Sequence, residues 1–223
     1  MRIRAALLCM ALAAAPLQAQ QAATQADARA VIAAVLTHQA SIRGAEGAAE
    51  TCVVADLSGP PAAPGAAAQD DPLAPDHAVH IYFQWHVPDA PPPARGAAAP
   101  PQPVTPGGRR NRPRAAPPPP PPAALPAAEA DHLNALRAQA ARAPAAPALA
   151  RIEPELIPAP LQALRPDDDC AQLTLSQPAF AGDAAFVELA YACGTVCGNG
   201  NLYALQRRDG RWTVTGIADI WIR

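Results

Sequence analysis

Apolar residues recur at helical spacing in two segments. Between residues 27 and 43 they form one helix face: Val31, Ile32, Val35, Leu36 and Ile42. Residues 127–143 carry a weaker stripe of Leu133, Leu136 and Ala140, and Pro144 marks its end. A lone helix of this size is marginal in water, so the first stripe predicts a helix packed on a sheet.

Alternation of apolar and polar residues predicts the strands of that sheet. Residues 78–87 show it most clearly, because the apolar series from Val79 to Val87 alternates with polar side chains and Tyr82. Residues 51–57 form a second expected strand, and from Cys170 onward the alternation predicts a β-meander with a hairpin at Asp209-Gly210. The expected fold class is α+β: an N-terminal helix packed on a curved antiparallel sheet.

Composition adds an interruption. Residues 88–126 are rich in the chain's 29 prolines and include the arginine cluster Arg109, Arg110, Arg112 and Arg114. Few apolar side chains offset the entropy of ordering them, so a long disordered insertion is expected, with its two ends close together. The arginines either contact an envelope polymer or protein, or only solubilise the loop. Residues 20–223 are thus expected to form a single interrupted domain.

Residues 1–19 have the pattern of a signal peptide, with cleavage expected near Ala19. The expected location is periplasmic or extracellular. Removal of Cys9 leaves four cysteines, and an even number in an exported chain predicts disulfides. We expect Cys193–Cys197 and Cys52–Cys170, although four cysteines allow two other connectivities.

Charge and residue usage narrow the functional classes. The net charge of −2 gives no global field for nucleic acid. The chain has no lysine, which removes lysine nucleophiles and phosphate-loop lysines. After the signal peptide no apolar run is long enough to predict a membrane span.

Metal and catalytic chemistry have weak signals. His80 and His86 would lie about 20 Å apart along a continuous strand, too far to share an ion. The acidic run at residues 167–169 lacks the ligand spacing of a calcium loop. We therefore predict no catalytic, metal or cofactor residues. One alternative stays open, a pocket lined by His80, Tyr82, His86, Tyr191 and Asp219.

The segment from Cys193 to Gly200 has the pattern Cys-Gly-x-x-Cys-Gly-x-Gly between two expected strands. We interpret it as a stapled hairpin end in which the glycines permit the reversal, with thiol exchange, zinc binding and a cysteine nucleophile as alternatives. With Tyr203, Trp212 and Trp221 following it, this segment resembles a group of small exported bacterial proteins that end in such a hairpin. They are loosely associated with NTF2-like or cystatin-like folds. The resemblance covers about the last fifty residues, implies an α+β fold and transfers no catalytic residue.

The expected function is a non-catalytic exported module that binds a ligand or partner. The alternatives are a small-molecule enzyme or thiol-redox protein with a pocket beside the Cys193/Cys197 hairpin, and an interaction protein acting through the proline-rich insertion.

Overall fold

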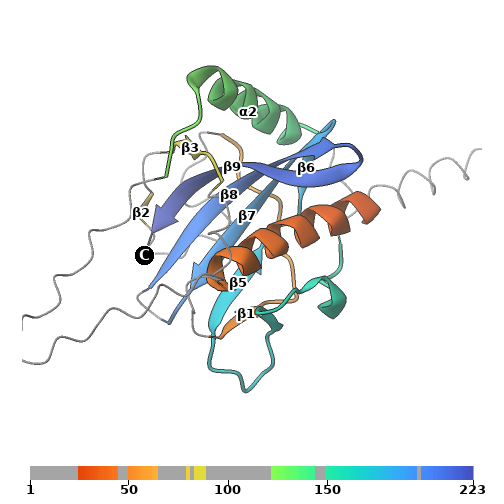
Figure 1. The fold of residues 1–223 in the computed structure, drawn as a ribbon, viewed down its shortest axis with the longest axis vertical. Helices are drawn as coiled ribbons and strands as arrows, with labels where there is room; N and C mark the ends of the chain where they lie inside the picture. Colours follow the sequence, from red (N-terminus) through yellow and green to blue (C-terminus); the bar gives the residue numbers. More distant parts are fainter. Residues whose placement is uncertain are drawn as a thin grey trace, which may run out of the picture.

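The computed structural model describes residues 25–44, 50–64, 79–80, 83–88, 122–143, 149–194 and 197–222, with only the backbone at 79–80. The expected signal peptide and most of the expected insertion lie outside these residues. Figure 1 shows a sheet with the N-terminal helix lying along it and helix α2 at one end.

In the part of the chain that the structure describes, two segments with apolar stripes are α-helical. The N-terminal helix spans residues 25–44 and buries Val31, Ile32, Val35 and Leu36 completely. Helix α2 (Ala127–Ala140) buries Leu133 and Ala140, and a short 3-10 helix, η2, spans Pro154–Leu156. None of the helices in the described ranges is long and apolar enough to cross a membrane.

Within the described residues, nine strands form one sheet in the order β2-β9-β8-β7-β5-β1-β4, with β3 also paired to β9 and β6 to β7. The α+β class with a large sheet is confirmed. The strands are β1 (Thr51–Val53), β2 (Val79–His80), β3 (Trp85–His86), β4 (Gln162–Ala163), β5 (Ala171–Leu175), β6 (Ala179–Ala181), β7 (Ala184–Ala192), β8 (Gly198–Arg208) and β9 (Arg211–Ile222).

The sheet is mixed, so the expected wholly antiparallel sheet is wrong. β1 pairs in parallel with both β4 and β5, Cys52 standing opposite Gln162 and Gln172. A parallel pair is joined by a long connection instead of a tight turn. No hairpin signal in the sequence therefore marks this pairing.

The expected continuous strand over residues 78–87 is also wrong. Both β2 and β3 pair antiparallel with β9, but His80 stands opposite Trp221 and Trp85 opposite Ala218. From the first pair to the second, the chain advances five positions on the side of β2 and β3 but only three positions along β9. The extra residues interrupt the strand. Val87, expected on the buried face, is 44% exposed.

The C-terminal meander follows its sequence pattern closely. β7, β8 and β9 pair antiparallel in sequence order along most of their lengths. Asp209 and Gly210 have φ values of 51° and 75°, as a two-residue hairpin of type I′ requires. The predicted hairpin is confirmed.

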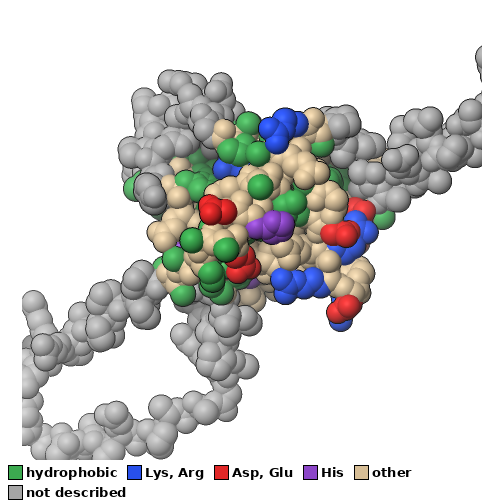
Figure 2. Space-filling view, turned by 90° about the horizontal axis from the view of Figure 1, so that it is seen from above, with side chains coloured by type: hydrophobic (Ala, Val, Ile, Leu, Met, Phe, Trp, Pro, Cys, Tyr) green, Lys and Arg blue, Asp and Glu red, His purple; other side chains and the backbone are tan. Residues whose placement is uncertain are grey.

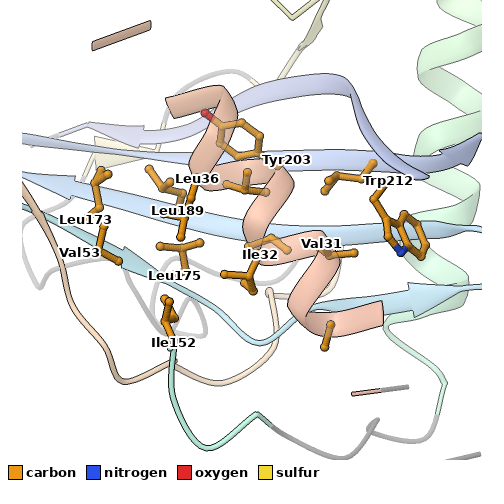
Figure 3. Packing of buried hydrophobic residues seen from close by; sticks show 14 of the residues in the cluster. Val31, Ile32, Leu36, Val53, Ile152, Leu173, Leu175, Leu189, Tyr203 and Trp212 are labelled. Atoms are coloured by element: carbon orange, nitrogen blue, oxygen red, sulfur yellow. The ribbon is translucent and has the colours of Figure 1, made fainter. Parts of the chain in front are cut away.

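The sheet carries a hydrophobic core on each face. On one face the N-terminal helix packs on alternate residues of the strands; Figure 3 shows Ile32 and Leu36 over Leu175 and Leu189. On the other, Trp85 and α2 pack on small residues such as Ala184, Ala204 and Ala218. We call these the helix-25–44 face and the α2 face. β7 is buried from both sides over most of its length.

Both predicted disulfides are present. Cys52 and Cys170 have Cα atoms 5.9 Å apart and are separated by 118 positions in the sequence. Cys193 and Cys197 have Cα atoms 5.2 Å apart at the β7–β8 connection. Both Cα distances lie in the range usual for disulfides.

The two sides of the expected insertion meet at the sheet edge. The Val87 N–H donates to the Ala123 carbonyl at 2.8 Å, and the Leu125 N–H donates to the Trp85 carbonyl at 2.9 Å. The described residues that flank positions 89–121 are therefore neighbours at the sheet edge.

Candidate functional site

The structure brings together two of the five residues expected to line a pocket. His86 of β3 and Asp219 of β9 both line a cleft, with His86 Nε2 and Asp219 Oδ2 4.0 Å apart. Tyr191 of β7 lies beside this cleft, under a residue that lines it. Tyr82 and the His80 side chain lie outside the described residues.

The cleft has a volume of about 270 Å³ and lies where the N-terminal helix ends over β8 and β9. β3 and Pro122 border it on the side of the sheet edge. Its polar side chains are Gln39, Arg43, His86, Asn201, Tyr203 and Asp219. Its apolar side chains are Ile42, Val87, Pro122 and Ile217. The cleft thus combines groups of both charges with an apolar wall.

A chain of side-chain amides holds Asp219. Asn199 Nδ2 donates to Asn201 Oδ1 at 2.7 Å, and Asn201 Nδ2 donates to Asp219 Oδ1 at 2.5 Å. Both asparagines lie at the start of β8, directly after the Cys193–Cys197 disulfide. The cysteine–glycine segment therefore leads directly into the residues that orient the carboxylate.

Tyr203 places a protonated hydroxyl at the base of the cleft. Its side chain is 1% exposed, and Gln39 Nε2 donates a hydrogen bond to its hydroxyl oxygen. Burial raises the pKa of Tyr203 from 10.0 to about 12, although the Gln39 hydrogen bond and the Arg43 charge oppose this rise. The nearby Asp219 charge adds to it. At neutral pH the phenol therefore keeps its proton and can donate it to an acceptor.

Arg43 and His86 contribute buried nitrogens that lack partners. The Arg43 guanidinium stacks over the Tyr191 ring, 4.1 Å from its centroid, which fixes the position of its charge. Arg43 Nε and His86 Nδ1 are both buried and have no hydrogen-bond partner in the described part of the chain. Buried polar atoms in proteins are nearly always hydrogen-bonded, so these two require explanation.

The glycines of the Cys193–Gly200 segment do not share one role. Gly194 has a φ of +100° and makes the reversal. Gly198 and Gly200 instead lie in β8, so the expectation that they permit the reversal is wrong. A Cβ on Gly200 would lie 2.1 Å from Trp221 Nε1, and one on Gly198 would lie 2.7 Å from the Tyr191 carbonyl oxygen. These two glycines permit close packing instead of a turn.

One group of potential metal ligands occurs in the described ranges: Cys52, Asp168 and Cys170. Both of its sulfurs form the Cys52–Cys170 disulfide. Metal binding by cysteine requires a thiolate, so this group lacks two of its three ligands in the oxidised protein. The carboxylate of Asp168 accepts a hydrogen bond from the Arg165 N–H at 2.9 Å.

Four polar residues of the cleft are absent from the residues predicted for it: Gln39, Arg43, Asn201 and Tyr203. One signal was available, because Gln39 and Arg43 are four residues apart and therefore share a helix face with each other. Gln39 continues the buried face and is itself only 6% exposed. A glutamine at a core position followed one turn later by arginine marks where an apolar stripe becomes a polar one.

Comparisons with family models, with curated proteins and with solved structures find no match for this chain. Figure 2 shows acidic and basic side chains interspersed on one face of the molecule, without a patch of a single sign among the coloured residues.

Proposed function

We propose that the chain is an exported module that binds a small ligand in the cleft between the N-terminal helix and strands β8 and β9. The supporting observation is the lining of this cleft of about 270 Å³, in which charged and polar side chains lie beside an apolar wall. Small-molecule sites combine apolar walls with a few placed polar groups in the same way.

Export is the second part of the proposal. The two disulfides support it, because disulfides persist in oxidising compartments outside the cytoplasm. Cleavage near Ala19 would release the mature chain. N-terminal sequencing of the exported protein tests this point, and a mature chain that still begins at Met1 would contradict it.

The binding function is tested by closing the cleft mouth. Val87 lines the cleft and is 44% exposed, so Val87→Trp adds a large side chain at the mouth while leaving the core intact. Ile222→Trp is the matched control, because Ile222 is 46% exposed and is not among the residues that line this cleft.

The measurement is ligand-observed NMR on the disulfide-bonded protein with mixtures of sugars, amino acids and organic acids. We expect at least one class to bind, and that binding to be lost in Val87→Trp and kept in Ile222→Trp. The absence of binding in every class, or binding that both variants keep, would contradict the proposal.

An enzyme using the same cleft is the second candidate. The observation that favours it is the proximity of His86 and Asp219, a combination common in acid–base sites. A thiol-redox role has less support, because Cys193 and Cys197 connect two strands instead of beginning a helix that would lower a thiol pKa. A His86→Ala variant that abolishes a measured turnover while ligand affinity is kept would favour the enzyme.

A further inference from the structure

One basic and one acidic side chain line the cleft without pairing. Arg43 comes from the last turn of the N-terminal helix and Asp219 from β9, and no ion pair within 4.0 Å joins them. Both charges act on the Tyr203 hydroxyl, where Arg43 lowers the pKa and Asp219 raises it. The two opposite charges therefore lie near one buried hydroxyl and line the same cleft.

Each charge is held in place by its own contacts. Arg43 is fixed by stacking on Tyr191, and Asp219 by the amide chain from Asn199 through Asn201. Asp219 Oδ2 has His86 Nε2 at 4.0 Å, which is beyond hydrogen-bonding distance. Two fixed charges of opposite sign favour a ligand that carries the complementary pair.

The remaining lining sets the size and character of the ligand. Ile42, Val87 and Ile217 give one side of the cleft an apolar surface. The cleft volume of about 270 Å³ lies just below the range typical of pockets that bind drug-sized ligands. A molecule with both charges on one small polar end and a short apolar side chain matches this arrangement.

We infer that the cleft binds a small zwitterion, an α-amino acid with an apolar side chain, with its carboxylate at Arg43 and its ammonium group at Asp219. This inference rests on the proposed function, since it names the ligand of the same cleft. The Tyr203 hydroxyl donates a second hydrogen bond to the carboxylate. A dianion such as phosphate is disfavoured, because the Asp219 carboxylate would repel it.

The first test compares three probes on the wild-type protein by isothermal titration calorimetry. L-leucine carries both charges, N-acetyl-L-leucine lacks the ammonium group, and 3-methylbutylamine lacks the carboxylate. Because each analogue loses one charge-assisted contact, L-leucine is expected to bind about tenfold or more tightly than either analogue. Equal affinity for either analogue overturns the inference.

Two variants assign the two ends of the ligand. Arg43→Gln removes the partner of the carboxylate, so this variant is expected to bind L-leucine no better than it binds 3-methylbutylamine. Asp219→Asn removes the partner of the ammonium group, so this variant is expected to bind L-leucine no better than it binds N-acetyl-L-leucine. Arg29→Gln is the control, because Arg29 is an exposed arginine of the same helix, paired with Glu153 at 2.6 Å. The Arg29→Gln protein should bind L-leucine with unchanged affinity. Circular dichroism verifies folding, and the wild-type comparison does not depend on the variants.

The outcomes separate this inference from the proposed function. If a sugar or an organic acid binds and Val87→Trp removes that binding while L-leucine does not bind, the ligand-binding function stands and the zwitterion is wrong. If no probe binds, both are wrong.

Discussion

The two faces of the sheet are covered in different ways. On the helix-25–44 face, large side chains meet large side chains, as where Leu36 packs over the leucines of β5 and β7. On the α2 face, small sheet residues receive large covering groups, as where Leu133 Cδ1 lies 3.0 Å from the position a Cβ on Gly216 would take. Both faces belong to the same strands, and β7 contributes to both.

The difference shows where each face is sensitive to substitution. A face packed from large residues loses stability when a side chain is shortened, because a cavity remains. A face built on small residues loses stability when a side chain is enlarged, because the covering group must move. Val53 of β1 belongs to the core on the helix-25–44 face, so the adjacent Cys52 points to the α2 face. The Cys52–Cys170 disulfide therefore braces the α2 face covalently.

The largest expected effect comes from removing that brace. The double variant Cys52→Ala/Cys170→Ala should lower the free energy of unfolding by about 5 kcal/mol, because the disulfide closes a loop of more than one hundred residues. Denaturant unfolding measures this loss.

The matched control is Cys193→Ala/Cys197→Ala, whose disulfide spans a separation of 4. The same chain-entropy relation gives a loss of about 2 kcal/mol for it. Equal losses in the two double variants would contradict the dependence on loop length.

The next effect tests large-to-large packing. Leu36→Ala should lower the free energy of unfolding by about 3 kcal/mol, because the residue is fully buried and the surrounding core cannot collapse into the space. Leu133→Ala on α2 should cost about half as much, since a helix with only two buried residues can shift inward. Urea denaturation of both variants gives the ratio, and a larger loss for Leu133→Ala would reverse the comparison.

The third effect is a dependence on alkaline pH. Below pH 10 Tyr203 is protonated in both states; above it, the unfolded chain releases the proton while the folded protein, with a Tyr203 pKa of about 12, retains it. Stability should therefore fall as the pH rises from 10 to 12, by about 1.4 kcal/mol at pH 11. Urea unfolding at pH 9 and pH 11 measures the difference.

Two variants assign this pH dependence. Tyr203→Phe should lose it, and Tyr191→Phe on the neighbouring strand should keep it. The charged groups that act on the Tyr203 hydroxyl, Arg43 and Asp219, are present in both variants. An unchanged alkaline loss in Tyr203→Phe would show that another group is responsible.

The smallest effect tests overpacking of the α2 face. Gly216→Val should cost about 1 kcal/mol, because its side chain would press on Leu133, Trp85 and Leu125. Thermal and urea unfolding measure it. The cost should shrink in a Leu133→Ala background, where the space exists. A stabilised Gly216→Val would mean that the β-propensity of valine outweighs packing on this face.

Local patterns in the sequence predicted the elements whose neighbours are also neighbours in the chain. The N-terminal helix followed from its apolar stripe, and the β8–β9 hairpin followed from Asp209-Gly210. The parallel position of β1 left no such signal, because its partners come more than one hundred residues later. The interruption between β2 and β3 was missed because alternation continues in the sequence through a segment whose pairing register changes.

The same distinction explains the candidate site. His86 and Asp219 were proposed because each lies on the polar face of a strand with alternating apolar and polar residues. Arg43 and Tyr203 belong to segments that the sequence predicts separately, as a helix and as part of the β-meander. Their shared cleft depends on how the helix lies across β8, which no spacing within either segment encodes.

The junction between Val87 and Ala123 has a practical consequence for engineering. The Val87 N–H donates a hydrogen bond to the Ala123 carbonyl. The side chains of Val87 and of Pro122, which precedes Ala123, line the cleft. A circularly permuted fluorescent domain spliced in place of residues 89–121 would have both ends anchored at the rim of the cleft. Its brightness would then report occupancy of the cleft, which would make the protein the scaffold of a genetically encoded sensor.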